Sequence, residues 1–201
     1  MKKNLIIPLT FLLFLVPYLL FAGGDDPVTE ANLDRLDLQK TGMITLGSWA
    51  IGNIAVSGLQ MSRTSGSQFR FHQMNVFWNV VNLGIAAGGY YGAATAQPEG
   101  FTAMQTLKEY HSFNKILLLN AGLDVGYVLG GLYLTERAKN LSKRQNMLKG
   151  YGQSIMLQGA FLFIFDLVLY GFMNEQTHAF MNSSGLSLLS TPGKVGLMYT
   201  F

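Results

Sequence analysis

Two aspartates in apolar stretches are the residues of this sequence whose type and position most readily suggest chemistry. Asp124 lies near the centre of the run Ile116–Leu134, which contains no lysine or arginine, and Asp166 lies within the run Ser154–Met173. Each run is long enough to cross a lipid bilayer, because a helix needs about 20 residues at 1.5 Å per residue to do so. Ionisable side chains in such helices usually face the interior of a protein or a cavity. We therefore expect both carboxyl groups to point inward.

The two carboxyl groups are expected at a similar depth in the membrane. Counted by helical rise, each lies roughly 12–15 Å below the exported surface. Two acids that meet there without a cationic partner do not both ionise, so at least one should be protonated at neutral pH and donate a hydrogen bond. Two interpretations stay open. The acids could form neutral hydrogen bonds between helices, each worth about 1 kcal/mol or less, or they could form a proton or cation site or line a polar cavity.

Asparagine, histidine and tyrosine residues recur at helical spacing around these acids. Asn120 and Tyr127 lie one turn before and one turn after Asp124, which places all three on one helical face. Another run, 72–94, carries a polar stripe that should turn toward the interior for the same reason. The predicted lining of a polar interior, which is also the candidate binding site, is Asn53, His72, Asn75, Asn79, Asn82, Asn120, Asp124, Tyr127, Gln158, Asp166 and Tyr170.

Glycines repeat every fourth residue along two of the runs. This spacing lets two membrane helices approach closely. We therefore expect tight helix packing at Gly84, Gly88 and Gly92 in one run and at Gly122, Gly126 and Gly130 in the other. Each row begins two residues after an asparagine, Asn82 in one run and Asn120 in the other. Either an inverted duplication or a shared glycine-rich composition would produce this similarity.

The composition excludes several classes of function. Of the 201 residues, 49% are hydrophobic and only 12% are charged, about half the charged fraction of a soluble domain. A formal net charge of +3 is too small to indicate a nucleic-acid partner, and the absence of cysteine excludes disulfides, thiolate metal sites and a cysteine nucleophile. No catalytic triad, phosphate-binding loop or metal-binding histidine pair is recognisable. We expect neither a metal nor another cofactor, and the chain does not look like an enzyme.

The order of segments predicts an all-α membrane protein. Lys2 and Lys3 precede an apolar run and the small residues 22–24, as in a secretory signal peptide or an uncleaved signal anchor. An antiparallel four-helix transmembrane bundle should follow, with a β-like hairpin in the tail that turns at 191–193. The predicted segments are a signal at 1–22, an exported segment with a short amphipathic helix at 23–42, a bundle at 43–173 with spans at about 43–61, 72–94, 116–134 and 154–173, and an exported tail at 174–201.

The distribution of basic residues predicts the orientation. With the signal exporting the segment that follows it, the connections 62–71 and 135–153 face the cytoplasm. They contain Arg63, Arg70, Arg137, Lys139, Lys143, Arg144 and Lys149, as the positive-inside rule requires. We therefore expect a multi-pass protein of the bacterial inner membrane with both ends of the mature chain on the exported side.

Two sequence motifs resemble those of a known family. Phe71-His72-Gln73-Met74-Asn75 is followed by Trp78-Asn79 and Asn82, and later come Gln158-Gly159-x-Phe161 and Phe165-Asp166. Together they are similar to an uncharacterised bacterial family of small four-helix membrane proteins. The resemblance covers roughly residues 35–173, and it implies the architecture and no activity.

Two functional hypotheses from different classes follow. The first is a non-enzymatic accessory or interaction protein with a polar interior that is structural or binds a small ligand. Its partners would be the lipid bilayer and another membrane protein or a second copy of the chain. The alternative is a small proton- or cation-coupled transporter that uses Asp124 and Asp166.

Overall fold

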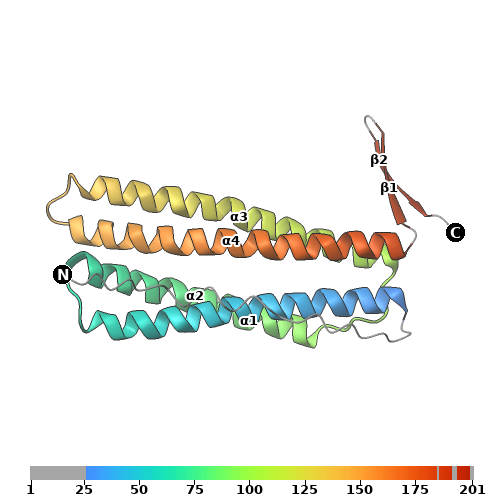
Figure 1. The fold of residues 1–201 in the computed structure, drawn as a ribbon, viewed down its shortest axis with the longest axis horizontal. Coiled ribbons are helices and arrows are strands. Elements are labelled where there is room, and N and C mark those ends of the chain that lie inside the picture. Colours follow the sequence, from blue (N-terminus) through green and yellow to red (C-terminus); the bar gives the residue numbers. More distant parts are fainter. Residues whose placement is uncertain (1–25, 185, 192–193, 200–201) are drawn as a thin grey trace, which may run out of the picture.

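The computed structural model describes residues 26–184, 186–191 and 194–199 of the chain, and four long helices make up most of it. The prediction of four long helices is confirmed (Figure 1). The predicted signal segment and the turn of the tail hairpin lie outside the described residues. The helices are α1 (Pro27–Met61), α2 (Gly66–Thr95), α3 (Ala103–Ala138) and α4 (Gln145–Ser183).

The helices are longer than the apolar runs suggest. The expected short helix at 23–42 and the first run form the single helix α1, and the helix expected before Ile116 is continuous with the third run in α3. The helices begin where local signals favour it: the Asp26 side chain accepts from the Val28 N–H beside Pro27, and Thr102 forms a capping box at the start of α3. Separate short helices were a wrong prediction, because nothing in between breaks the helical hydrogen bonds.

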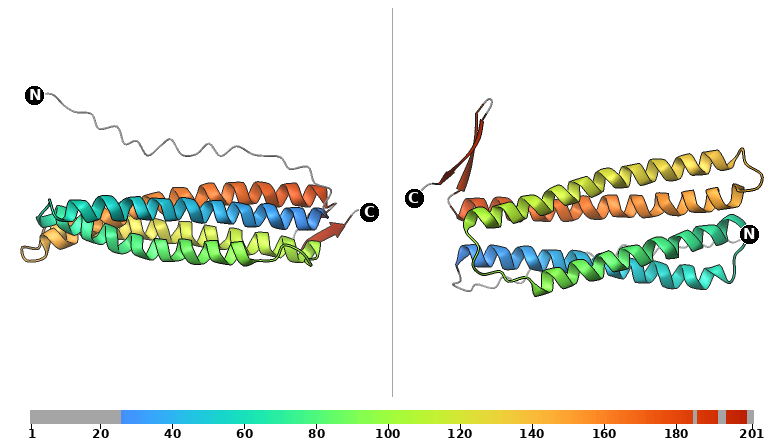
Figure 2. Two further views of the ribbon diagram at one scale, coloured as in Figure 1. Left: turned by 90° about the horizontal axis from the view of Figure 1, so that it is seen from below. Right: turned by 180° about the vertical axis from the view of Figure 1, so that it is seen from behind.

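The helices form two hairpins that pack side by side. The views of Figures 1 and 2 show α1 beside α2, α3 beside α4, and the connections between consecutive helices at alternate ends of the bundle. Helix α4 packs along α3 and also contacts α2 and α1, whereas α2 and α3 do not pack against each other. After α4, the strands β1 (Leu186–Thr191) and β2 (Lys194–Tyr199) pair in antiparallel register.

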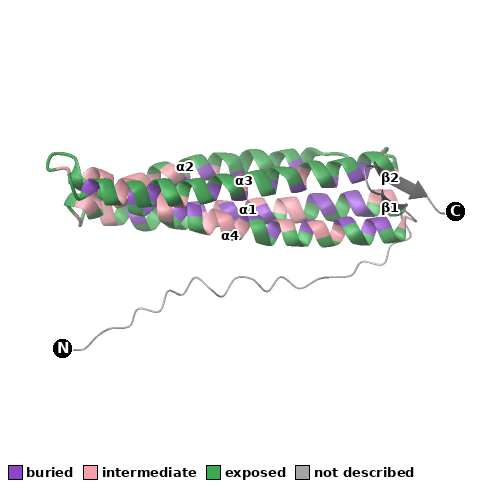
Figure 3. Cartoon of the chain, turned by 90° about the horizontal axis from the view of Figure 1, so that it is seen from above, coloured by how far each residue is buried: buried purple, intermediate pink, exposed green. Residues whose placement is uncertain are grey.

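The bundle is apolar outside and polar inside. Figure 3 shows how much of the helix surface is exposed, and the exposed large side chains include Ile51, Phe77, Leu119 and Ile164. The buried residues include a long series of polar ones: Asn32, Arg35, Ser57, Asn75, Asn79, Asn82, Thr106, Asn114, Asp124, Ser154, Gln158, Asp166 and Thr177. A surface of this kind suits lipid better than water.

Three of the helices are long and apolar enough to cross a membrane. They are α1, α3 and α4. Helix α2 does not reach the same mean hydropathy, because it carries Arg70, His72 and the asparagines of its polar stripe. The membrane crossing by α2 that the sequence led us to expect therefore stays a prediction.

The repeated glycine rows do not pack as predicted. A side chain added at Gly84, Gly88, Gly92, Gly122, Gly126 or Gly130 would meet no atom of another described element within 4 Å, so the predicted tight contacts are not made within the described part of the chain. The close approaches use other glycines. A Cβ at Gly131 would lie 2.5 Å from the Gly152 carbonyl oxygen, and one at Gly150 would collide with the Ser67 carbonyl. The rows fail because α2 and α3 turn these faces away from the other helices.

Candidate functional site

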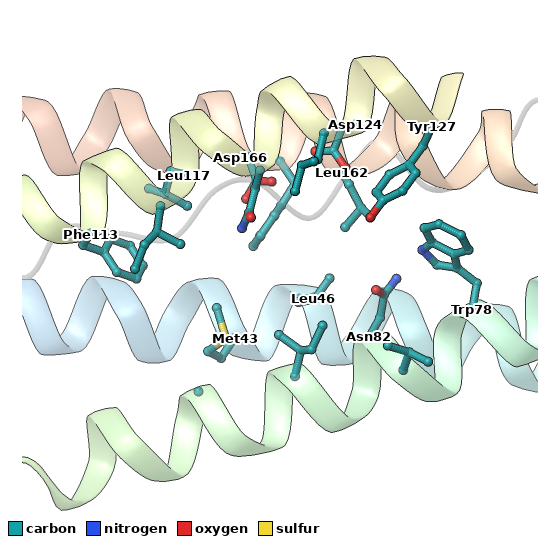
Figure 4. A pocket seen from close by; sticks show the side chains of 17 residues that line it. Met43, Leu46, Trp78, Asn82, Phe113, Leu117, Asp124, Tyr127, Leu162 and Asp166 are labelled. Carbon is teal, nitrogen blue, oxygen red and sulfur yellow. The ribbon is translucent and has the colours of Figure 1, made fainter. Parts of the chain in front are cut away.

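A cavity of about 370 Å³ lies between the two helical hairpins. Its lining comes from all four helices, with α2 on one side and α3 and α4 on the other (Figure 4). Most of the walls are apolar: Leu46, Val81, Ile85, Leu117, Leu123 and Leu162 all line it. Its size and its few polar groups are typical of a binding site for a small molecule.

The two aspartates predicted from the sequence meet at this cavity. Asp124 of α3 is 3% exposed and Asp166 of α4 is 5% exposed, and their carboxyl groups lie within hydrogen-bonding reach of each other. An ionised carboxylate can only accept, so a hydrogen bond between the two requires that one of them carries a proton. Among the described residues, the lining contains no lysine or arginine. When one of the two carboxyl groups is ionised, the pair carries one negative charge, and a proton on the other group can form the hydrogen bond between them.

Two buried polar atoms at the cavity have no partner among the described residues. One is Oδ2 of Asp124, and the other is Nδ2 of Asn82, whose side chain is 4% exposed. Figure 4 shows the Asn82 amide extending from α2 into the space below the acids. Leaving such atoms without a hydrogen bond costs about 1–3 kcal/mol each.

Aromatic side chains line the same space. Trp78 of α2 and Tyr127 of α3 are in edge-to-face contact, with 4.9 Å between their ring centroids, and they bridge the two helices that otherwise do not pack together. Phe113 and Phe165 line the cavity as well. Between α2 and α3 the cavity wall is formed by side chains that are half exposed: Val81, Ile85, Ile116 and Leu123.

A second polar region lies in the bundle on the side of the α1–α2 connection. Trp49 Nε1 donates to Gln158 Oε1 at 2.9 Å, and Gln158 Nε2 donates to Asn75 Oδ1 at 2.5 Å. The amide nitrogen of Asn75 in turn donates to Asn53 Oδ1 at 2.9 Å and to Ser57 Oγ at 2.8 Å. His72 Nδ1 is 3.2 Å from the same hydroxyl. We call these six residues the amide network; they join α1, α2 and α4.

The predicted interior therefore separates into two places. Asn82, Asn120, Asp124, Tyr127 and Asp166 line the cavity. Asn53, His72, Asn75 and Gln158 belong to the amide network, and Asn79 donates to the Asn75 carbonyl beside it. Tyr170 is half-buried and lies in neither place.

Sequence reasoning missed several of the residues that complete these sites. Trp49 and Trp78 were not predicted to line these sites because tryptophan is apolar enough to face lipid. The motif that contains Trp78 and its spacing from Asn82 were usable signals that Trp78 faces the interior. Ser57 follows Asn53 by one turn, which was a usable signal. A further buried cluster in the first turns of α1 and α3 was not anticipated: Asn32 Nδ2 donates to Thr106 Oγ1 at 2.8 Å, and Tyr110 donates to the Ala31 carbonyl at 2.7 Å.

The described residues do not suggest a metal site. No group of three or more histidine, aspartate or glutamate side chains comes together in the described part of the chain. The acid pair and the asparagine amides instead offer a hydrogen-bonding site with a single negative charge.

Fold and site together define a class: a four-helix bundle with an apolar surface and an acidic interior cavity. Residues 45–167 match a family described as a family of unknown function, DUF6992, and the chain belongs to that family. This confirms the expectation of an uncharacterised family. Comparison with curated proteins and with solved structures found no match.

Proposed function

We propose that this protein is a non-enzymatic integral membrane protein that binds a small ligand in the cavity between its hairpins. The observation that carries the proposal is the pair of buried acids, Asp124 and Asp166, in the lining of a largely apolar cavity. Intramembrane ionisable groups are expensive and are usually retained for a function. The absence of a nucleophile–base pair around the acids favours binding over catalysis.

The same proposal places the bundle in the inner membrane of a bacterium. Helix α2 would be the fourth crossing, its polar face covered by α1 and α4 through the amide network. The α1–α2 and α3–α4 connections lie at the same end of the bundle (Figure 1), and the basic residues predicted to face the cytoplasm are in or near them. This agreement supports an orientation with the opposite end exported. A ligand-binding subunit of this kind would act beside another membrane protein.

A second candidate function is supported by the shared proton of the acid pair. A carboxyl pair that can take up or release one proton near the middle of a bundle is also what a small proton- or cation-coupled transporter needs. Asp124 and Asp166 would then be the coupling residues. Binding alone and coupled transport differ in whether charge crosses the membrane.

The test uses the full chain in lipid vesicles that enclose a pH-sensitive dye. The Trp49→Phe variant leaves Trp78 as the single tryptophan reporter, because the chain has only two. Ten-carbon amphiphiles brominated at the end of the chain should quench Trp78 in a saturable manner. The Leu162→Phe substitution in the Trp49→Phe background, which narrows the cavity without adding a tryptophan, should weaken the saturable response of Trp78 to these probes.

The outcomes separate the two candidates. Saturable quenching without a change of internal pH supports a binding protein. Proton movement that disappears in the Asp124→Asn, Asp166→Asn double variant supports the transporter instead. If no probe quenches Trp78 more than it quenches Trp49 in the Trp78→Phe variant, the cavity does not bind small molecules and the proposed function is wrong.

A further inference from the structure

We infer that the ligand of this cavity is a lipophilic organic cation, a hydrocarbon body that carries one ammonium group and reaches the acids from the bilayer between α2 and α3. This inference rests on the proposed function and specifies its ligand. It follows from the charge of the lining, from the aromatic side chains around it and from the side on which the cavity is open.

Charge balance at the acid pair is the first argument. Asp124 and Asp166 line the cavity together with the amides of Asn82 and Asn120, and no basic residue of the described part of the chain is in the lining. When one carboxyl group is ionised, the pair holds one negative charge that no described side chain neutralises. An uncompensated charge away from water is costly. A ligand with one positive charge removes that cost when its ammonium group lies beside the acid pair.

The nature of the walls distinguishes an organic cation from a metal ion. A hard cation prefers six or more oxygen ligands, whereas most of the lining here is leucine, isoleucine, valine and phenylalanine. The aromatic rings of Trp78, Phe113, Tyr127 and Phe165 surround the same space. Aromatic rings attract ammonium groups through their electron-rich faces, and more strongly where water is excluded. Acids and aromatic rings in an apolar cavity are therefore a recognition set for an alkylammonium group.

The open side of the cavity explains why the ligand should be lipophilic. Helices α2 and α3 do not pack against each other, and the edges of the gap are the exposed apolar side chains of Val81, Ile85 and Ile116. In a bilayer, those side chains face acyl chains. A molecule dissolved in the hydrocarbon could therefore slide between the helices with its charged group leading toward the acids.

The experiment compares three brominated ten-carbon probes that differ only in the head group. They are an amine, an alcohol and a carboxylate, each added to the Trp49→Phe protein in vesicles of neutral lipid at pH 7. We expect the amine to quench Trp78 at a concentration at least tenfold lower than the alcohol, and the carboxylate to quench weakest. The Trp78→Phe protein, in which Trp49 reports from the amide network outside the cavity lining, corrects for partition of the probes into lipid.

The acid variants test the cause of the preference. In the Asp124→Asn, Asp166→Asn double variant the negative charge is gone, so the amine should lose its advantage while the alcohol still binds. Each single variant keeps one carboxyl group, and an asparagine amide can donate to it, so a single variant should retain most of the preference. A matched double variant at two acids outside the cavity, Glu136→Gln with Glu99→Gln, should leave the preference for the amine unchanged.

The result that overturns the inference differs from the one that overturns the proposed function. Equal or tighter binding of the alcohol or the carboxylate means that the cavity binds a neutral or anionic ligand, and the inference is wrong while the binding function stands. An amine preference that survives in the double variant assigns the selectivity to the lipid surface or to another site, and also contradicts it. If none of the three probes gives saturable quenching, both the proposed binding function and the inferred ligand are wrong.

Discussion

The amide network and the cavity are two polar regions of one bundle, yet they differ in how completely their polar groups are satisfied. In the network, Gln158 and Asn75 each use both ends of the side-chain amide. At the cavity, Asp124 Oδ2 and Asn82 Nδ2 are buried without a partner. A polar group removed from water costs little when it is paired and much when it is not. The six residues of the network are therefore well satisfied as a structural element, and the acids of the cavity are not tied into such a network.

Packing also differs between two pairs of helices. Helices α3 and α4 approach until Gly131 and Gly152 lie against each other's carbonyl groups. Helices α2 and α3 stay apart, and side chains such as Trp78 and Tyr127 connect them. Mutations between α3 and α4 should therefore affect stability, and mutations between α2 and α3 should affect ligand binding.

The largest loss of stability is expected from Gly131→Ala. The new methyl group would lie 2.5 Å from the Gly152 oxygen and 2.6 Å from Met156 Cγ, so the two helices must move apart. We expect the free energy of unfolding to fall by about 2 kcal/mol or more. Unfolding by sodium dodecyl sulfate, followed by circular dichroism of the reconstituted chain, measures this.

The neighbouring Gly130→Ala variant is the matched control. Its methyl group would meet nothing within 4 Å, and alanine favours a helix over glycine by about 0.5–1 kcal/mol. Stability equal to or above that of the parent is expected. Equal losses in both variants would mean that α3 and α4 do not approach as described.

A smaller loss is expected from Gln158→Leu in the amide network. The substitution removes the acceptor of Trp49 and the donor to Asn75 and leaves both of those groups buried. Hydrogen bonds between membrane helices average below about 1 kcal/mol and reach about 1.7, so a loss of about 1–2 kcal/mol is expected. The exposed Gln153→Leu on the same helix should cost nothing, and a network variant as stable as this control would show that the network is not structural.

The acid pair should contribute little to stability. Its contrast with the amide network, whose loss should destabilise the bundle, is the most informative of these comparisons. Asp124→Asn and Asp166→Asn each keep a hydrogen bond in the pair without needing a shared proton, so each should change the free energy of unfolding by less than about 1 kcal/mol. The double variant should be at least as stable as the parent, because it removes a buried negative charge. Thermal unfolding in detergent measures it. A large loss in the double variant would make the acids part of the structure, as in the network.

The helices and the inward direction of the acids could be predicted from the sequence, because both follow from local regularities. Apolar runs of helical length mark the helices, and the high cost of an exposed carboxyl group in lipid determines where Asp124 and Asp166 point. The continuation of α1 back to Pro27 was missed because the charged residues there, such as Arg35, resemble those of a surface segment. The burial of the neighbouring Ala31 and Asn32 depends on hydrogen bonds to α3, whose residues lie more than 70 positions away in the chain.

The division of the polar residues between the network and the cavity could not be predicted. Asn75 and Asn82 lie on the same stripe of α2, two turns apart, and their sequence surroundings are alike. Which of them finds partners depends on the divergence of α2 from α3, which a single helix does not encode. The glycine rows misled for a related reason: their spacing shows that a close approach is sterically allowed, and it does not identify the helix that makes it.

The smallest effect is expected where the glycine rows face away from the chain. The Gly122→Ala, Gly126→Ala double variant adds two methyl groups that meet no atom of the protein, so stability should change by less than about 0.5 kcal/mol beyond the gain in helix propensity. The same holds for Gly84→Ala with Gly88→Ala. Because a surface of small residues suits contact between membrane helices, a clear loss in these variants that grows with the protein-to-lipid ratio would mean that a second copy packs there. In that case α2 or α3 is covered in the assembly, and access to the cavity between them depends on the oligomeric state.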